Sequence, residues 1–462
     1  MTVIAIDKDL CTGCQECVKI CPNLAIEGVP HQPQTLNEQK CVMCGQCVQK
    51  CKSYVSVAEH GFGAYEKIRV QRNLPPTVLE PLFAAYNVCH LDEVLRALAD
   101  PNVETWVQSA PAVRVGIAED FGAPLGSLAA GRLAAALRRI GFDKVYDTNY
   151  AADVTIMEEG SELIDRVKNN GLLPMFTSCC PAWVRYLELN YPELRNHLST
   201  TKSPQQIQGA LMKTFGAKAQ KTEAKKIFSV SIMPCTCKQY ESSRPEMIDS
   251  GHRDVDVVLT TRELAYLIKL KGLDFLGLPE EKFDLPMGDY TGAAEIFGVT
   301  GGVMEAALRT GYELITGQPI PAVDIKAVRG PDGFRTADIA VGELTLKVGI
   351  VTGLKNVKPV LDDLKAGKLN LHFIEVMTCP EGCVTGGGQP KLIVDKDFEA
   401  AYQARTEATY LHDRELPIRK SHENPSVKKL YESFLKRPLG SESHKLLHTT
   451  YCGDPKSHAA HH

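Results

Sequence analysis

Cysteine is the residue type whose number and spacing in this 462-residue sequence most clearly suggest chemistry. Sixteen cysteines are present, and eight of them lie within residues 11–51. There the pattern Cys-x2-Cys-x2-Cys-x3-Cys occurs twice, beginning at Cys11 and at Cys41. Thiolates at this spacing are typical ligands of cubane iron–sulfur clusters, which carry electrons. Zinc is the alternative, but zinc sites usually separate two Cys-x2-Cys pairs by a longer loop.

The two runs also predict how the ligands are shared. In two-cluster ferredoxins with this spacing, the fourth cysteine of each run binds the cluster of the other run. We therefore expect two 4Fe-4S clusters, each held by three cysteines of one run and one of the other. The ligands would be Cys11, Cys14, Cys17 and Cys51 for one cluster, and Cys41, Cys44, Cys47 and Cys21 for the other.

Three further groups of cysteines stand much later in the chain. Each group directly follows an apolar run typical of a β-strand, and ligand sites in α/β folds lie at the carboxyl ends of strands. We therefore expect the groups to meet in one crevice, where they offer at least four thiolates. The glycines at 386–388 would let the backbone approach a bulky group closely. The groups lie at 179–180, 235–237 and 379–383, after the runs 172–176, 228–233 and 371–377.

The elements that must position these cysteines alternate in type. From about residue 80 onwards, runs rich in β-branched residues alternate with helical patterns, which favours α/β layering with largely parallel sheets. The first 60 residues are short of long helices and dense in cysteine. Expected strands include 113–117, 227–232, 255–259, 346–351 and 371–376, and expected helices include 126–140, 162–169 and 303–315.

Composition excludes several classes of protein. Apolar residues make up 44% and charged residues 23% of the chain, as in ordinary globular proteins. The formal net charge of −4 gives no basic excess of the kind that nucleic-acid binding requires. No apolar run reaches the roughly 18 residues that a membrane helix needs. The N-terminal residues show neither the pattern of an export signal nor a twin arginine, so we expect a cytoplasmic protein.

Three segments carry a resemblance to a known family. They are Thr177-Ser-Cys-Cys-Pro-Ala-Trp183, Met233-Pro-Cys-Thr-Cys-Lys-Gln-Tyr-Glu241 and the long segment Glu375 to Pro390. In this order they resemble the signature of the iron-only (FeFe) hydrogenases, and the N-terminal cysteine runs resemble the bacterial subtype with two ferredoxin clusters. The resemblance extends over nearly the whole chain, including 202–206, 296–304 and 421–424.

The resemblance implies a fold and domain boundaries. A small N-terminal bacterial-ferredoxin-like (α+β) domain would be followed by a large α/β catalytic domain of two lobes with the H-cluster between them. The expected boundaries are 1–60 for the two-cluster domain, 61–100 for a connecting segment, 101–440 for the H-cluster domain and 441–462 for a C-terminal tail.

The resemblance also implies the activity and its cofactors. The enzyme would reversibly cleave dihydrogen into two protons and two electrons, which ferredoxin or flavodoxin would exchange with the two N-terminal clusters. The H-cluster is a 4Fe-4S cubane that Cys383 would bridge to a diiron subsite with CO, CN⁻ and azadithiolate. Maturation proteins would supply that subsite, and the protein is expected to be a monomer. Cubane ligands would be Cys180, Cys235, Cys379 and Cys383.

Other residues would serve the H-cluster without binding its iron. Lys238 would donate a charge-assisted hydrogen bond to a cyanide. Cys179 would pass protons to and from the diiron subsite, followed by Glu159, Ser199, Glu162 and Arg166. Glu159 and Glu162 are three residues apart and would share one face of a helix. The cavity wall would consist of Met233, Met377, Phe297, Ala110, Pro111, Pro204 and Gln205.

Three residues depart from the common pattern of this family: Ala112, Thr378 and Ala182. Thr378 stands beside Cys379, where its hydroxyl could form a hydrogen bond near the cubane sulfurs and shift the reduction potential. Cys237 stands two residues after Cys235 and is interpreted as a packed or hydrogen-bonding thiol, with iron ligation as the alternative. The alternative function is that of an iron–sulfur assembly or carrier protein on the same scaffold, without the two-iron subsite.

Overall fold

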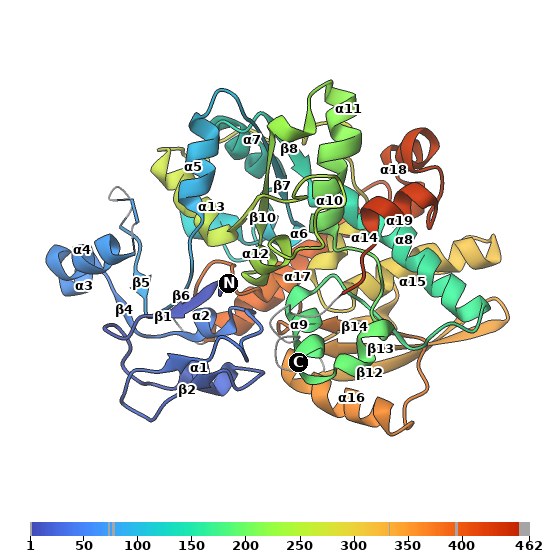
Figure 1. Cartoon of the computed structure of the whole chain (residues 1–462), viewed down its shortest axis with the longest axis horizontal. Coiled ribbons are helices and arrows are strands. Elements are labelled where there is room, and N and C mark those ends of the chain that lie inside the picture. The colour runs from blue at the N-terminus through green and yellow to red at the C-terminus, as the bar shows by residue number, and fades with distance from the viewer. Residues whose placement is uncertain (1, 73, 76–78, 332, 393–395, 452–462) are drawn as a thin grey trace, which may run out of the picture.

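The computed structural model describes residues 2–72, 74–75, 79–331, 333–392 and 396–451. Two parallel or mostly parallel sheets form the centres of two lobes, and the N-terminal cysteine-rich part lies beside them (Figure 1). This arrangement agrees with the expected fold, a small ferredoxin-like domain followed by a two-lobed α/β domain. Cys452 and the rest of the expected tail from 452 to 462 lie outside the described residues.

The N-terminal part is built from short elements around its cysteines. Helices α1 (Glu16–Ile20) and α2 (Gln46–Lys50) each begin after a residue with positive φ, Gln15 at 63° and Gly45 at 72°. Such a turn reverses the chain directly after the second cysteine of each run. Among the described residues, three pairs of antiparallel strands complete this part: β1 (Ile4–Ile6) with β6 (Ala85–Asn87), β2 (Ile26–Glu27) with β3 (Thr35–Leu36), and β4 (Tyr54–Val55) with β5 (Leu82–Phe83). Helices α3 (Val57–His60) and α4 (Phe62–Gln71) follow β4 in the chain.

The first lobe contains a parallel sheet with strand order β11-β10-β7-β8. Successive residues of its central strand face opposite layers: Val107 packs among residues of α5, α7 and α13, whereas Trp106 packs among residues of α8 and α10. The strands are β7 (Glu104–Ser109), β8 (Lys144–Asp147), β10 (Ile227–Met233) and β11 (Val257–Thr260), and these helices are α5 (Leu91–Ala99), α7 (Ala130–Ile140), α8 (Thr148–Lys168), α10 (Pro204–Leu211) and α13 (Thr261–Leu270).

The second lobe contains a mixed sheet with strand order β12-β13-β14-β9, in which only the edge strand β12 is antiparallel. One face packs against α9 and α16, and the other packs against α8 and α15. Helix α8 therefore contributes to the cores of both lobes. The elements are β9 (Met175–Phe176), β12 (Phe334–Val341), β13 (Leu344–Thr352), β14 (Phe373–Met377), α9 (Pro181–Asn190), α15 (Gly302–Thr316) and α16 (Val357–Lys365).

One expected strand is wrong. Residues 113–117 do not form a strand, because Pro111 begins a short helix, α6 (Pro111–Arg114), directly after β7. The apolar residues of this segment are buried on two sides: Val113 and Ile117 lie in the core of the first lobe, and Val115 packs beside Val299. Val113, Val115 and Ile117 are therefore spaced like the inward residues of a β-strand because the segment is buried between two layers, and not because it forms a strand. The other expected strands are present, with ends shifted by a few residues.

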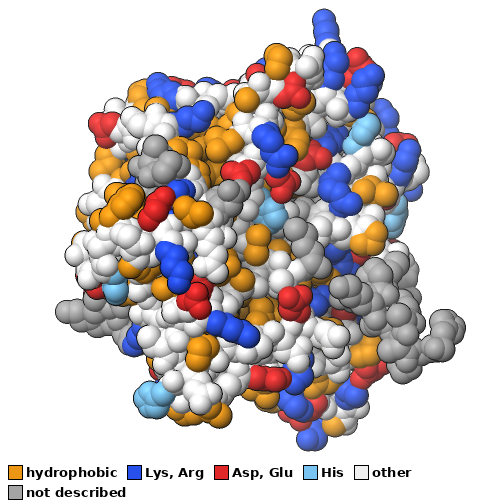
Figure 2. Space-filling view, turned by 60° about the vertical axis from the view of Figure 1, so that its left-hand side comes forward, with side chains coloured by type: hydrophobic (Ala, Val, Ile, Leu, Met, Phe, Trp, Pro, Cys, Tyr) orange, Lys and Arg blue, Asp and Glu red, His pale blue; other side chains and the backbone are white. Residues whose placement is uncertain are grey.

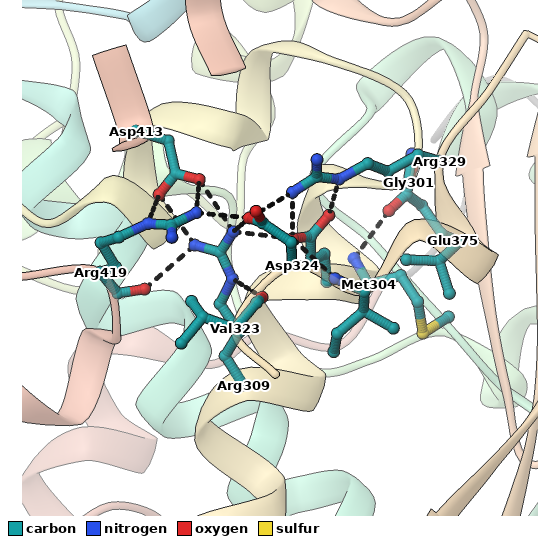
Figure 3. Close-up of polar contacts among 12 residues, drawn as sticks. Gly301, Met304, Arg309, Val323, Asp324, Arg329, Glu375, Asp413 and Arg419 are labelled. Atoms are coloured by element: carbon teal, nitrogen blue, oxygen red, sulfur yellow. Dashed lines mark hydrogen bonds and ion pairs between the residues drawn. The ribbon is translucent and has the colours of Figure 1, made fainter. Parts of the chain in front are cut away.

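The C-terminal segment joins the two lobes. Helix α17 (Lys396–Glu415) places Arg405 in an ion pair with Glu119 of the first lobe, and Asp413 in an ion pair with Arg309 of α15. Figure 3 shows that Arg309 and Arg419 point at the carboxylate of Asp413 from different segments. Helices α18 (Pro425–Leu430) and α19 (Ser441–Leu447) then lie against α8 and α10 (Figure 1).

On the face shown in Figure 2, basic and acidic side chains are interspersed. None of the helices among the described residues is both long and apolar enough to cross a bilayer.

Candidate active site

The three later cysteine groups come together in one cavity between the lobes. Cys179 and Cys180 follow β9, Cys235 follows β10, and Cys379 and Cys383 follow β14, and all five line this cavity. Two of the strands belong to the sheet of the second lobe and one to the sheet of the first. The crevice expected from the sequence therefore lies at the meeting of two sheets.

Local sequence sets the backbone conformation around two of these cysteines, Cys180 and Cys383. Pro181 occupies the first turn of α9, which leaves Cys180 as the extended residue that precedes the helix. Before Cys383 the chain turns sharply at Gly382, whose φ is 96°. A Cβ atom there would lie 2.7 Å from the backbone nitrogen of Thr300, so both the positive φ and the close approach require glycine.

The four expected cubane ligands lie close enough to affect one another electrostatically. Burial, followed by the neighbouring charge of Cys180, raises the pKa of the Cys235 thiol to about 12. The sulfur of Cys235 accepts hydrogen bonds from the backbone N–H groups of Cys237 and Lys238, and the Sγ of Cys180 lies 3.2 Å from the hydroxyl oxygen of Thr378. Four soft thiolates with N–H and O–H donors beside them are a donor set that fits an iron–sulfur cubane.

The cavity wall contains every residue expected there and one ammonium group. Among the described residues that line it, Lys238 carries the only charged side chain. Its Nζ donates to the carbonyl oxygen of Cys179 at 2.9 Å and to Glu241 at 3.0 Å. The apolar or neutral wall residues are Ala110, Pro111, Pro204, Gln205, Met233, Phe297 and Met377.

The residues that depart from the common family pattern occupy defined positions. Ala112 lines the cavity, and its carbonyl oxygen accepts a hydrogen bond from Gln389 at 2.6 Å. Ala182 is buried in the first turn of α9. The Cys237 thiol donates to the carbonyl oxygen of Val42 at 3.3 Å, as a packed thiol would.

Cys179 and Glu159 lie close together at the inner end of a line of polar and titratable groups. Glu159 is buried and Cys179 is partly buried. The pKa of Cys179 lies well above its ordinary value because of desolvation and the nearby Glu159. Burial, with the neighbouring Glu162, raises the pKa of Glu159 to about 8. Its Oε2 atom is buried without a hydrogen-bond partner in the described part of the chain. A carboxyl group with this pKa can both hold and release a proton near neutral pH.

The outer part of the line is connected by short contacts. Ser199 donates to Glu162 at 2.9 Å, and Arg166 donates to the same carboxylate at 2.6 Å. Arg166 is partly exposed. Glu158 lies on another face of α8, where it binds Tyr431 and His448. The five residues expected to form the relay thus lie near one another, from Cys179 at the cavity to the partly exposed Arg166.

Sequence reasoning missed one buried acid beside this path. Glu375 in β14 accepts hydrogen bonds from the backbone N–H groups of Gly301 at 2.6 Å and Met304 at 2.8 Å, at the start of α15 (Figure 3). Burial raises its pKa to about 7, and its charge acts on both Glu159 and Cys383. The signal in the sequence was a glutamate inside an otherwise apolar strand.

The N-terminal cysteines gather in the two expected sets. The cysteines whose charges act on Cys17 are Cys51, Cys11 and Cys14, and these four line one small cavity. The strongest cysteine neighbours of Cys47 are Cys44, Cys41 and Cys21. Backbone N–H groups donate to several of these sulfurs, and such hydrogen bonds help to set the reduction potential of an iron–sulfur cluster. The donors are those of Gln34 to Cys11, Ala25 to Cys21, Met43 to Cys41 and Ala85 to Cys51.

The second N-terminal set borders the central cavity. Cys44 lines that cavity and is electrostatically close to Cys235 and Cys379. The glycine triplet makes this approach possible, because a Cβ atom on Gly387 would lie 2.4 Å from the carbonyl oxygen of Cys44. The bulky group that the backbone of Gly387 approaches is thus the N-terminal part of the chain itself.

Comparisons with protein families assign almost all of the chain. Residues 103–387 match the model described as "Iron only hydrogenase large subunit, C-terminal domain". Residues 399–454 match "Iron hydrogenase small subunit", and residues 3–52 match "4Fe-4S dicluster domain".

Individual relatives agree with these families. The chain is 46% identical to the NADP-reducing hydrogenase subunit HndD of Solidesulfovibrio fructosivorans, over 89% of this chain and 73% of the relative. It is also 46% identical to the periplasmic [Fe] hydrogenase large subunit of Nitratidesulfovibrio vulgaris, over 84% and 86% of the two chains. A solved structure of the [FeFe]-hydrogenase HydA1 from Chlamydomonas reinhardtii matches with a TM-score of 0.69 and 41% identity, over 79% of this chain and 99% of that one.

The names of several more distant relatives describe a different role, in iron–sulfur cluster assembly. Cytosolic iron-sulfur assembly component 3 of Mus musculus is 30% identical, over 78% of both chains.

Proposed function

The chain belongs to the iron-only hydrogenase family, and from this premise we propose that its cysteine-lined cavity is the site where dihydrogen is reversibly cleaved into two protons and two electrons. The observation that carries the proposal is the convergence of four cysteine thiols with a fifth, Cys179, beside them and next to Glu159. A protein that only stores or transfers a cubane has no need of a thiol and two glutamates in line with it.

The residues of the cavity would hold the H-cluster and control its surroundings. Cys180, Cys235, Cys379 and Cys383 would bind the cubane, and Cys383 would also bridge to the diiron subsite. When bound, this group supplies the redox and acid–base chemistry that splits dihydrogen heterolytically. The apolar wall excludes water, so the ammonium of Lys238 acts on its neighbours through a weakly screening medium. Glu241 holds that ammonium in place.

The relay residues would carry the proton between the cavity and the solvent. The Cys179 thiol would exchange it with the Oε2 atom of Glu159, which is buried and free of other partners within the described residues. From there it would pass to Ser199, whose hydroxyl already contacts Glu162. Arg166 would hold the Glu162 carboxylate at the outer end.

Electrons would leave by a separate route through the N-terminal part. The cluster of Cys21, Cys41, Cys44 and Cys47 would be the inner one, because Cys44 borders the central cavity. The cluster of Cys11, Cys14, Cys17 and Cys51 would be the outer one, and the exposure of Cys14 supports its exchange with an external carrier. We expect that carrier to be ferredoxin or flavodoxin.

Several finer expectations belong to the same proposal. The diiron subsite would be supplied by maturation proteins, since the chain itself offers the cubane ligands and the bridging cysteine. We also expect the protein to be a monomer. A cytoplasmic location is the expectation from the sequence, although one relative is called periplasmic.

The test is infrared spectroscopy combined with a gas assay. The chain produced together with maturation proteins should show bands of metal-bound CO and CN⁻ and should both consume and evolve dihydrogen. Protein produced without them should bind cubane iron but show no such bands. A matured sample with cubane iron alone and no exchange of dihydrogen would contradict the proposal and favour the alternative role in iron–sulfur assembly or transport.

A further inference from the structure

The segment that carries Ser199 is held on both sides by other parts of the chain. The backbone N–H of Ser199 donates to the carbonyl oxygen of Phe176 in β9 at 2.7 Å. On the opposite side Thr449 donates to Thr200 at 2.8 Å, and Lys202 donates to Leu447 at 2.8 Å. The outer relay is therefore clamped between the second sheet and the C-terminal segment.

His448 links this clamp to two glutamates of α8. Its Nδ1 lies 2.8 Å from the hydroxyl oxygen of Thr200, and its Nε2 lies 3.1 Å from the Oε2 of Glu158. The backbone N–H of Thr200 in turn donates to the Oε2 of Glu162 at 3.0 Å. The imidazole is buried, with 4% of its side chain exposed. The His448 ring thus contacts both Thr200, which binds Glu162, and Glu158, which precedes Glu159 in α8.

The other partners of Glu158 also come from the C-terminal segment. Tyr431 donates to its Oε1 at 2.5 Å, and the backbone N–H of Leu439 donates to its Oε2 at 2.8 Å. Glu158 is fully buried, so these donors fix the turn of α8 that also carries Glu159, the neighbour of Cys179. Removal of one donor would leave a buried carboxylate incompletely paired and free to change its position.

We propose that His448 is a positioning residue of the proton relay: it fixes Thr200 against Glu162 and Glu158 against α8, so that Ser199 and both relay glutamates keep their hydrogen-bond distances. This inference rests on the proposed function for its effect on turnover, while the geometry itself can be tested in the chain without the diiron subsite. Loss of about an ångström in a positioned relay is enough to lower a rate by a large factor.

The test compares three variants. His448→Ala removes both contacts, whereas the amide of His448→Asn can replace Nδ1 beside Thr200 and lacks the reach to Glu158. The control is His444→Ala, which removes an exposed ring that packs against His448 in a tilted arrangement, at a centroid distance of 4.5 Å. Measured quantities are amide hydrogen exchange at Thr200 in the chain without the diiron subsite, and turnover with its solvent isotope effect in the matured enzyme.

In His448→Ala we expect amide exchange at Thr200 to become at least about tenfold faster, turnover to fall by about tenfold and the solvent isotope effect to rise. His448→Asn should restore most of the protection at Thr200 and part of the turnover, and His444→Ala should behave as the native chain. Unchanged exchange at Thr200 in His448→Ala would overturn the proposal. The proposal would also be overturned if the Ala and Asn variants lost turnover equally and their unfolding midpoints fell equally. A general loss of stability would then explain the lower turnover.

A failure of the proposed function is distinguishable from these outcomes. In that case the native chain itself would lack CO and CN⁻ bands and dihydrogen exchange, while the amide exchange at Thr200 would still decide the positioning role of His448.

Discussion

At the residue scale, three glutamates in one helix have different surroundings because they face different layers. Glu158 faces the C-terminal segment and is bound by Tyr431, Leu439 and His448. Glu159 lies beside Cys179, and Glu162 faces Ser199 and Arg166. The spacing of Glu159 and Glu162 was readable from the sequence, but the partners were not, since they come from segments far away in the chain.

The raised pKa of Glu159 should make the stability of the fold depend on pH. Because the folded protein raises its pKa from 4.5 to about 8, its favourable contribution to stability is complete below pH 4.5 and is lost as pH rises through about 8. One such group changes the free energy of unfolding by up to about 1.4 kcal/mol per pH unit in this window. Glu159→Gln should remove this part of the slope, measured by urea unfolding of the chain without the diiron subsite.

The control for this variant is Glu343→Gln, a change at an exposed acid, which should leave the slope unaltered. In the matured enzyme Glu159→Gln should also lower turnover by about a hundredfold or more, because an amide cannot carry the proton. Identical slopes in the native chain and in Glu159→Gln would contradict the burial of a proton-binding carboxyl group at this position.

Thr378 should tune the cubane through one hydrogen bond. With a cluster bound, its hydroxyl can donate to the Sγ of Cys180, which lies 3.2 Å away, and a donor at sulfur stabilises the reduced, more negative cluster. A net hydrogen bond of about 1 kcal/mol corresponds to about 40 mV for one electron. Thr378→Ala should therefore lower the potential of the cubane by about that amount in a redox titration, and Thr378→Ser should not. Equal potentials in all three proteins would remove this role.

At the scale of elements, the sequence revealed the strands that carry the cysteines but not how they combine. The runs before Cys179, Cys235 and Cys379 are strands, as their β-branched and apolar residues indicated. That they belong to two sheets depends on crossovers that no local pattern encodes. The segment around Val115 was misread as a strand, because burial on two sides produces the same alternation as a pleat.

The glycine triplet is the element that sets the distance between two cluster sites. Because a Cβ atom on Gly387 would lie 2.4 Å from the oxygen of Cys44, Gly387→Ala must push α2 and Cys44 away from the central cavity. In the chain reconstituted with cubanes we expect weaker magnetic coupling between reduced clusters in electron paramagnetic resonance spectra. Turnover of the matured enzyme with reduced ferredoxin should fall severalfold at equal iron content. The matched control is Gly63→Ala, whose Cβ meets open space, and unchanged coupling in Gly387→Ala would refute the argument.

At the scale of the whole molecule, the C-terminal segment connects the lobes through charges that are far apart in sequence. Helix α17 contributes Arg405 to Glu119 of the first lobe and Asp413 to Arg309 of the second. Residues 399–454, which match a small-subunit family, contribute no strand to either sheet within the described residues but add apolar side chains to the core of the first lobe. Composition and periodicity gave no indication of this role, because a charged residue on a helix is usually exposed to solvent.

Asp413 is where this connection should be most sensitive. Its carboxylate is fully buried and accepts hydrogen bonds from Arg309 at 2.9 Å and from Arg419 at 2.6 Å (Figure 3). Burial alone would raise its pKa, but these two guanidinium groups lower it below the ordinary value. Its contribution to stability is therefore present at neutral pH and is lost as pH falls through the lowered pKa.

Asp413→Asn removes the negative charge that pairs with Arg309 and Arg419. This loss should lower the free energy of unfolding by about 3–5 kcal/mol at pH 7. The matched control is Asp363→Asn, which breaks the exposed pair with Lys368 and should cost less than about 1 kcal/mol. Chemical unfolding at pH 7 and at acidic pH compares the two. The difference between native and Asp413→Asn proteins should shrink as the medium becomes acidic, because the native carboxylate then takes up a proton. Equal costs for the two variants at pH 7 would show that the lobes are joined by apolar packing and not by this buried charge.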